Sequence, residues 1–145
     1  MHAADVAAVI LALADAGVEV WVEGGWGVDA LVGEETRPHK DVDLLVRPDD
    51  AEALVGWLEA HDFRLVAGEP SAGLWRDDTG RGVDTRTTAT VEPGWLTGTG
   101  TIGGVVVWCL TVEGQLALHE GYPPEAKDRH DVELLRRRFG AAGAG

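Results

Sequence analysis

Residues 21–43 read WVEGGWGVDALVGEETRPHKDVD, and this segment decides the fold. Its first residues predict a short strand that Gly24-Gly25 ends. Residues 26–31 then predict one or two helical turns, and residues 41–46 predict a second strand. The segment therefore predicts four elements in close succession: a strand, a glycine turn, a helix and a second strand.

Two aspartates stand two residues apart on the predicted second strand. Residues i and i+2 of a strand face the same side, about 6.5–7 Å apart, so Asp41 and Asp43 project together while Val42 and Leu44 face the core. Paired carboxylates can bind one or two Mg²⁺ ions, which complete their shells with phosphate and water. Asp84 is the best candidate for a third carboxylate on a neighbouring strand, which would complete a two-metal site. By itself, the Asp-x-Asp pattern is more often a solvated strand edge.

The glycine turn before the helix is a candidate phosphate site. Backbone N–H groups at Gly24 and Gly25 and the helix N-terminus can hold phosphate oxygens, and a side chain there would keep the phosphate away. Taken alone, the glycines fit a plain tight turn equally well. Trp26 is a candidate nucleotide-binding residue because an aromatic ring can stack on a base or a sugar, although core packing is the default for a tryptophan.

Residues 36–40 place positive charge just before the paired aspartates. Arg37 could neutralise phosphate charge through forked hydrogen bonds, and His39 adds a titratable imidazole. An exposed polar loop is the alternative for this segment alone. A phosphate turn, a basic loop and an Asp-x-Asp strand in this order are improbable together by chance.

The rest of the chain predicts further elements around this segment. Helices are predicted near residues 6–13, 48–58, 111–119 and 125–139, strands near 63–66, 74–76 and 83–87, and a hairpin over 99–110 with its turn at Gly103-Gly104. The order predicts an α+β fold with a mixed, twisted sheet and helices mainly on one face. We expect one domain over residues 1–140, whose last helix Gly140 ends, and a disordered Ala/Gly tail over residues 141–145.

The composition argues against several classes of protein. The chain has 145 residues and a formal net charge of −13, so it lacks the positive surface that double-stranded nucleic acid requires. This charge could attract a polycationic small molecule or serve solubility alone. We expect a cytoplasmic protein without a membrane partner, because no apolar run could span a bilayer, the N-terminus lacks a basic signal region, and the single Cys109 excludes an internal disulfide.

The motifs resemble those of antibiotic nucleotidyltransferases of the lincosamide and aminoglycoside 2″ type, in the DNA polymerase β-like nucleotidyltransferase superfamily. The resemblance covers nearly the whole chain, through residues 21–31, Thr36-Arg37-x-His39-x-Asp41-x-Asp43, and residues 96–104, 119–123 and 127–132. It implies a minimal nucleotidyltransferase core that transfers a nucleoside monophosphate, usually AMP from ATP, to a hydroxyl of a small molecule and releases pyrophosphate. It also implies a homodimer with the acceptor pocket between subunits.

The resemblance further implies that Lys127 reaches the triphosphate, whereas its position four residues before Asp131 on a helix predicts that these two may pair with each other instead. The sequence departs from relatives after Asp84, where Thr85-Arg86-Thr87 replaces a common Leu-His-Pro run. This difference lies where the acceptor would bind. The sequence therefore specifies the nucleotide chemistry more closely than the acceptor.

The resulting hypothesis is a magnesium-dependent nucleotidyltransferase with two Mg²⁺ ions, ATP as co-substrate, and an aminoglycoside or lincosamide as acceptor. Asp41, Asp43 and Asp84 are its predicted catalytic and metal-binding carboxylates. Asp84 either binds the metal near the acceptor or takes the hydroxyl proton, and Glu23 and His39 are weaker candidates for the base. The alternatives are a catalytically silent nucleotide-binding module and an enzyme that nucleotidylates a protein, as in some toxin–antitoxin pairs.

Overall fold

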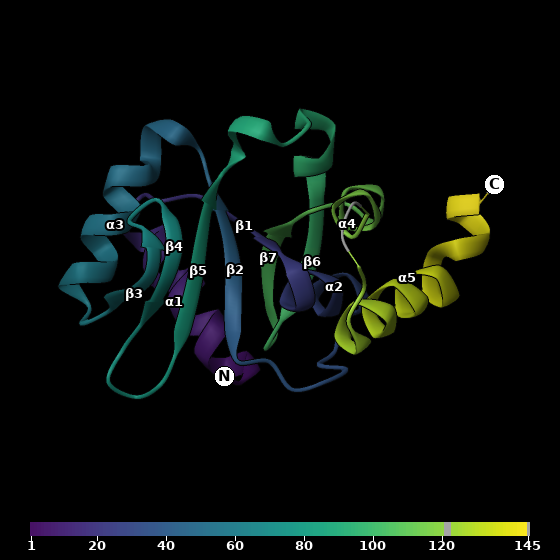
Figure 1. Cartoon of the computed structure of the whole chain (residues 1–145), viewed down its shortest axis with the longest axis horizontal. Coiled ribbons are helices and arrows are strands. Elements are labelled where there is room, and N and C mark those ends of the chain that lie inside the picture. Colours follow the sequence, from purple (N-terminus) through teal and green to yellow (C-terminus); the bar gives the residue numbers. More distant parts are fainter. Residues whose placement is uncertain (121–122, 145) are drawn as a thin grey trace.

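A seven-stranded sheet carries the fold (Figure 1), and the computed structural model describes residues 1–120 and 123–144. Its strands are β1 (Val20–Glu23), β2 (Asp41–Val46), β3 (Arg64–Glu69), β4 (Ala72–Arg76), β5 (Gly82–Thr87), β6 (Gly98–Ile102) and β7 (Val105–Cys109). Its α-helices are α1 (Ala3–Asp15), α2 (Gly24–Val32), α3 (Ala51–Ala60), α4 (Val112–Leu118) and α5 (Ala126–Ala144). Short 3-10 segments lie at Pro48–Asp50, Thr88–Thr90 and Pro93–Thr97.

The strand order in the sheet is β3-β4-β5-β2-β1-β7-β6. β2 runs parallel to β5 and β1 runs parallel to β7, whereas the other neighbouring pairs are antiparallel. The α+β class and the mixed sheet predicted from the sequence are therefore confirmed. β2, the strand with the paired aspartates, lies at the centre of the sheet between β5 and β1.

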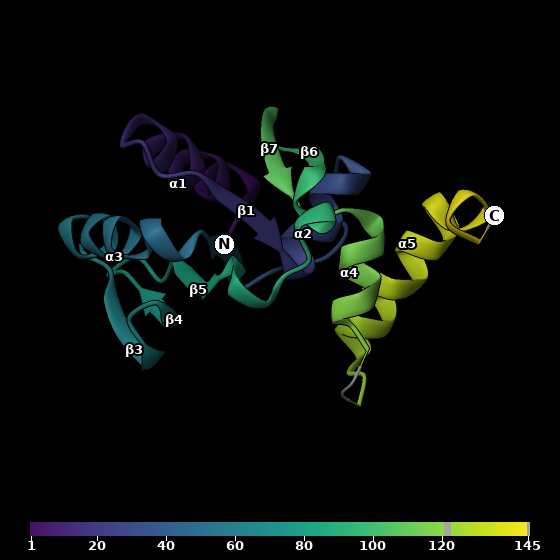
Figure 2. The same ribbon diagram turned by 90° about the horizontal axis from the view of Figure 1, so that it is seen from above.

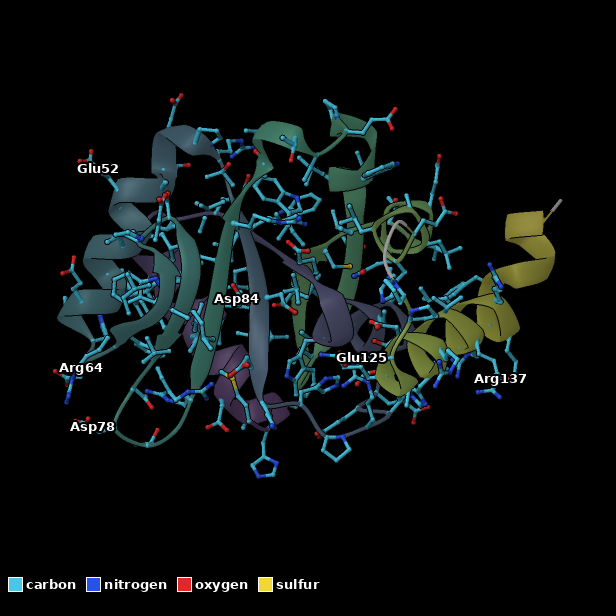
Figure 3. The ribbon with its side chains drawn as sticks, viewed as in Figure 1. Glu52, Arg64, Asp78, Asp84, Glu125 and Arg137 are labelled. Atoms are coloured by element: carbon cyan, nitrogen blue, oxygen red, sulfur yellow. The ribbon has the colours of Figure 1, made fainter. Side chains whose placement is uncertain are left out.

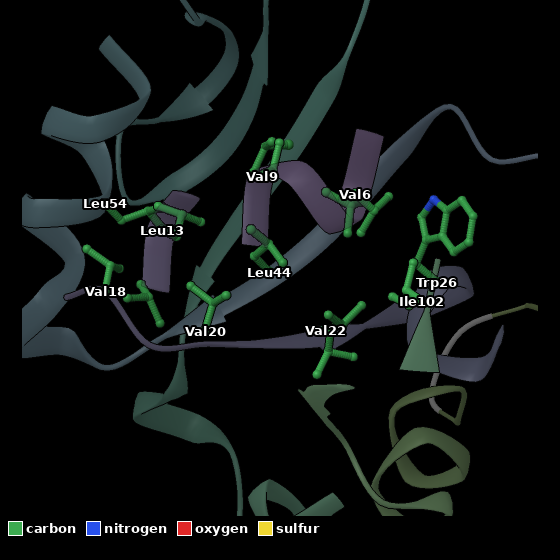
Figure 4. Packing of buried hydrophobic residues seen from close by; sticks show 14 of the residues in the cluster. Val6, Val9, Leu13, Val18, Val20, Val22, Trp26, Leu44, Leu54 and Ile102 are labelled. Atoms are coloured by element: carbon green, nitrogen blue, oxygen red, sulfur yellow. The ribbon is translucent and has the colours of Figure 1, made fainter. Parts of the chain in front are cut away.

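The main hydrophobic core lies on the face of the sheet covered by α1, α2 and α3. α1 lies behind the strands in Figure 1, and Figure 2 shows α1 and α4 on opposite sides of β1. The apolar residues of α1 recur at helical spacing and therefore form one buried stripe. Figure 4 shows this stripe packed against the inward side chains of the strands, with Val6, Val9 and Leu13 facing Val20, Val22 and Leu44.

The opposite face of the sheet has a smaller apolar cluster. Trp21, Leu45, Val91 and Leu110 are buried there beneath partly buried residues of the segment Pro93–Thr97. The indole N–H of Trp21 donates a 2.8 Å hydrogen bond to the carbonyl of Leu96 and holds this segment in place. The small cluster covers only part of the face, and polar side chains occupy the neighbouring positions.

Two glycines form the predicted turn of the β6–β7 hairpin. Gly103 and Gly104 have φ angles of 56° and 79°, and a tight two-residue hairpin turn requires such left-handed backbone. Thr111 caps α4 at the start of the predicted helix, because its side chain accepts a 3.1 Å hydrogen bond from the N–H of Gly114.

The end of α5 differs from the prediction. The helix does not stop at Gly140 but continues to Ala144, through most of the predicted tail. Alanine has the highest helix propensity and offsets the cost of a glycine within the last turns. Three residues of the segments named in the sequence predictions lie outside the described residues, namely Gly121, Tyr122 and Gly145. In the described parts of the chain, no helix is both long and apolar enough to cross a membrane.

Candidate active site

Three acidic residues line up across neighbouring strands on the sheet face opposite α1. Glu23 of β1, Asp43 of β2 and Asp84 of β5 occupy matching positions in adjacent strands. Adjacent strands lie about 4.8 Å apart, and directly paired residues carry their side chains on the same face. The three carboxylates therefore form one acidic row. Figure 3 shows Asp84 on the face of the sheet turned toward the viewer.

Asp41 lies on the same face of β2, because Val42 and Leu44 are fully buried in the core as predicted. Its partner in β5 is Gly82, and the partner of Gly82 in β4 is Arg76. Since Gly82 has no side chain, Arg76 reaches across it, and Nη2 of Arg76 lies 3.1 Å from Oδ1 of Asp41. A Cβ atom on Gly82 would overlap this carboxylate oxygen.

Burial and mutual repulsion raise the pKa values of the acidic row. Burial, followed by the charges of Glu23, Asp84 and Asp41, raises the pKa of Asp43 to about 7. Burial also raises the pKa of Asp84, and the charge of Asp41 raises it further. For Glu23 the effect of burial on the pKa exceeds the opposing effect of Arg86, whose Nη2 lies 2.7 Å from Oε1 of Glu23.

This concentration of negative charge fits a divalent cation, which would relieve the repulsion and accept the carboxylate oxygens as ligands. One of these oxygens, Oδ1 of Asp41, is buried and has no hydrogen-bond partner. Among residues 1–120 and 123–144, no three acidic, histidine or cysteine side chains form a ready group of metal ligands. Asp41, Asp43 and Asp84 nevertheless suit Mg²⁺ in chemistry and in charge, although their carboxylates do not converge on one point in this structure.

The glycine turn packs directly against the aspartates and the basic loop. Gly24 has a left-handed φ of 62°, and a Cβ atom there would overlap Oδ2 of Asp43. A Cβ atom on Gly25 would overlap Nη2 of Arg37 and would lie 2.7 Å from Nδ1 of His39. α2 begins at this turn, so the backbone N–H groups of its first turn are available for a phosphate.

The last helix orients the guanidinium of Arg37. Nε and Nη2 of Arg37 donate hydrogen bonds of 3.0 and 2.8 Å to the two carboxylate oxygens of the buried Asp131. Lys127 instead lies with its Nζ 3.9 Å from Glu125, in an exposed ion pair. Pairing of Lys127 with Asp131 is therefore wrong, because Asp131 turns inward toward the loop while Lys127 stays on the exposed side.

We expect Asp131→Asn to raise the KM for ATP severalfold, because Arg37 would lose a charged partner that fixes its direction. The variant should also melt at a lower temperature, since hydrogen bonds to charged groups contribute about 1.5–3 kcal/mol. ATP kinetics and thermal melting measure both effects. Glu133→Gln, at an exposed position of the same helix, is the control. An unchanged KM for ATP in Asp131→Asn would contradict this role.

His39 is hydrogen-bonded to the buried Asp29, a residue to which the sequence predictions gave no role. Oδ2 of Asp29 lies 2.6 Å from Nε2 of His39, and Asp29 also accepts hydrogen bonds from the N–H and hydroxyl of Thr36. Burial raises the pKa of Asp29, but the hydrogen bonds from His39 and Thr36 outweigh burial and lower the pKa overall. His39 therefore orients the basic loop against the glycine turn. In the sequence, the feature that could have pointed to Asp29 is that it is the one carboxylate within an otherwise apolar helical segment.

The indole ring of Trp26 lies in the core, not in the site. Trp26 is 2% exposed and packs with the main cluster (Figure 4), and its ring centroid lies 4.5 Å from that of His39. The predicted stacking of its ring on a base or sugar is therefore wrong. Trp26 and Ala30 are four residues apart, so both face the sheet from one side of α2. The buried indole ring packs against the imidazole of His39 from the core side.

Most of these groups, but not Trp26, Asp29 or Arg76, line one cavity of about 620 Å³. α4 contributes Gln115 and His119, to which the sequence analysis gave no functional role. Gln115 is 1% exposed, and its Nε2 lies 3.5 Å from the carbonyl of Gly24, where it supports the turn. The structure brings the other predicted site residues together at this cavity, namely Gly24, Gly25, Arg37, His39, Asp41, Asp43, Asp84 and Lys127.

Comparison with known proteins agrees with this geometry. Residues 5–135 match the aminoglycoside-2''-adenylyltransferase family. A lincosamide resistance protein of Staphylococcus haemolyticus is 26% identical over 136 residues, which cover 82% of this chain and 84% of that protein. A 2''-aminoglycoside nucleotidyltransferase of Escherichia coli is 43% identical over 53 residues, which cover 34% of this chain and 30% of that protein.

The fold is also found among solved structures. The crystal structure of ANT(2'')-Ia in complex with adenylyl-2''-tobramycin matches with a TM-score of 0.78 and 23% sequence identity, over 92% of this chain and 87% of that one. The chain therefore shares the fold of that protein. The match over residues 5–135 makes the assignment specific: the chain belongs to the aminoglycoside-2''-adenylyltransferase family.

Proposed function

We propose that this protein transfers AMP from ATP to a hydroxyl of an aminoglycoside or lincosamide, in a magnesium-dependent reaction that releases pyrophosphate. The observation that carries the proposal is the acidic row of Glu23, Asp43 and Asp84, which shares one cavity with the glycine turn at Gly24-Gly25. The names of the matched relatives support both classes of acceptor.

The residues that line the cavity have different proposed roles. Asp41 and Asp43 would hold Mg²⁺, which when bound neutralises phosphate charge. The N–H groups of the glycine turn, Arg37 and Lys127 would bind the phosphates. The acceptor hydroxyl attacks the α-phosphorus in line with the departing pyrophosphate, so positioning and charge neutralisation supply most of the acceleration.

Asp84 is the group that we propose to take the proton of the acceptor hydroxyl. Its side chain is exposed, and partial desolvation and the charge of Asp41 raise its pKa above the ordinary value, which makes it a better proton acceptor than an ordinary aspartate. Glu23 lies at the other end of the row, where its ion pair with Arg86 occupies a carboxylate oxygen. Asp84 is therefore the better placed base.

Pyrophosphate release with ATP across a panel of aminoglycosides and lincosamides tests the function directly. We expect release with at least one acceptor and none without an acceptor. The product should gain the mass of one AMP unit. Absence of release with every acceptor, in protein that binds ATP, would favour a silent nucleotide-binding module. Release only with a protein acceptor would overturn the small-molecule assignment.

The net charge of −13 gives a prediction about the acceptor. Asp84 and Glu125 line the cavity from opposite sides (Figure 3), so a polycationic aminoglycoside should be attracted to it. We expect kcat/KM for an aminoglycoside at saturating Mg-ATP to fall as salt rises, because salt screens charges over about 8 Å at physiological ionic strength. A monocationic lincosamide should show a shallower slope. A flat response for both would mean that the acidity serves solubility alone.

A further inference from the structure

Arg76 is a cation beside the site that no part of the proposed mechanism uses. It lies on β4, in register with Gly82 of β5, and its Nη2 reaches over this glycine to 3.1 Å from Oδ1 of Asp41. Its Nη1 donates a 3.3 Å hydrogen bond to the carbonyl of Gly80, which ties the guanidinium to the β4–β5 turn. The side chains of Arg76 and Asp41 are 35% and 27% exposed, so the pair lies at the edge of the cavity.

The contact turns the two paired carboxylates away from each other. Oδ1 of Asp41 lies over Gly82, on the β5 side of β2, whereas Oδ2 of Asp43 lies over Gly24, on the α2 side. Two aspartates that share a cation need oxygens directed toward a common point. Oδ1 of Asp41 is the oxygen that Arg76 holds, so this oxygen becomes available to a shared cation only when the carboxylate turns away from Arg76.

The pair of Arg76 and Asp41 is also suited to exchange. Oδ1 of Asp41 is buried but accepts no hydrogen bond, so the contact with Arg76 is an ion pair without hydrogen-bond geometry. Ion pairs between partly exposed side chains are weak, so a divalent cation can displace the guanidinium. Arg86 and Glu23, in comparison, form a charged hydrogen bond of 2.7 Å.

We propose that Arg76 is a positioning residue that competes with the divalent cation for Asp41, so that metal binding and the Arg76–Asp41 ion pair exclude each other. The inference rests on the proposed function, because it takes Asp41 as a metal ligand. By linkage, whatever strengthens the ion pair weakens metal binding by the same factor. Arg76 therefore sets the metal affinity of the nucleotide-free protein without itself touching metal or substrate.

The test measures Mn²⁺ binding to the full chain without nucleotide, by the electron paramagnetic resonance signal of free Mn²⁺. Arg76→Met should bind Mn²⁺ about two- to fivefold more tightly than the wild type, as the loss of a partly exposed ion pair allows. Arg64→Met is the matched control, because Arg64 pairs with Arg76 in the β3–β4 register and its own ion pair with Asp78 lies away from Asp41. It removes the same charge and should leave the affinity nearly unchanged.

Three other results would overturn the inference. An equal gain in both variants would mean that general electrostatics, not competition, sets the affinity. An unchanged affinity in Arg76→Met would mean that the ion pair does not oppose the metal. Weaker binding would mean that Arg76 helps Asp41 to hold it. If Arg76→Met does not fold, Arg76→Gln takes its place, and we expect it to show the same gain in Mn²⁺ affinity.

The outcome is separable from that of the proposed function. If no acceptor releases pyrophosphate but Arg76→Met still binds Mn²⁺ more tightly than Arg64→Met, the competition stands and the proposed reaction falls. If an acceptor is adenylylated and the two variants bind Mn²⁺ alike, the reaction stands and the competition falls.

Discussion

Asp43→Asn is expected to lower turnover by about 100- to 1,000-fold or more, a loss typical of removing a group that stabilises charge in the transition state. The substitution removes the charge at the centre of the acidic row but keeps the shape of the side chain. Pyrophosphate release at saturating Mg²⁺ measures the loss. Asp49→Asn, at an exposed position just after β2, should leave turnover unchanged. Near-native activity of Asp43→Asn would remove Asp43 from the metal site.

The same variant should become more stable than the wild type in metal-free protein. The raised pKa of Asp43, about 7 against an ordinary 3.8, means that its ionisation is opposed in the folded state. The stability associated with this group is complete below about pH 4 and is lost as pH rises through about 7. Asparagine does not ionise, so the gain in melting temperature should be present at pH 8 and vanish at pH 4. A gain that is independent of pH would mean that repulsion is not its source.

Gly25→Val is expected to raise the KM for ATP by about 10- to 100-fold, the range for a displacement of about 1 Å at a reacting centre. The new Cβ atom would overlap Nη2 of Arg37 and crowd His39, and it would also block the approach of phosphate to the backbone. ATP binding and thermal melting on the same sample separate this effect from misfolding.

Gly56→Val provides the control for this change. Gly56 is an exposed residue of α3 with open space around its Cβ position, so valine there tests only the cost of a branched side chain in a helix. It should lower the melting temperature slightly and leave the KM for ATP unchanged. A normal KM in folded Gly25→Val would show that the glycine serves the turn and not the phosphate.

The short-range features of the site could be predicted from the sequence. Alternation along β2 separates Asp41 and Asp43 from Val42 and Leu44, and the glycines mark where β1 ends and α2 begins. These patterns depend on residues only a few positions apart. A similar local pattern around Asp84 predicted a third carboxylate on a neighbouring strand. Only the structure shows that Asp84 lies in register with Asp43.

The partners of the basic loop could not be predicted in this way. Arg37 and Thr36 contact residues of α5 that lie 94 positions later in the chain, and no local pattern specifies such a pairing. The burial of Trp26 depends likewise on which side of α2 meets the sheet. Core packing was the default expectation for Trp26, but its ring was also a candidate to stack on a base or a sugar, and the spacing with Ala30 was not used to decide between them.

The bond between Arg37 and Asp131 also determines when the site can form during synthesis. A bacterial or eukaryotic ribosome adds about 5–20 residues per second, so the 94 positions between these residues take roughly 5–20 seconds to make. During this interval β1, α2 and β2 can come together and bury their apolar side chains, but Arg37 lacks the partner in α5 that orients it. The nascent chain can therefore acquire its sheet well before it can hold a triphosphate, and a chain that ends before α5 would fold around an unfinished nucleotide site.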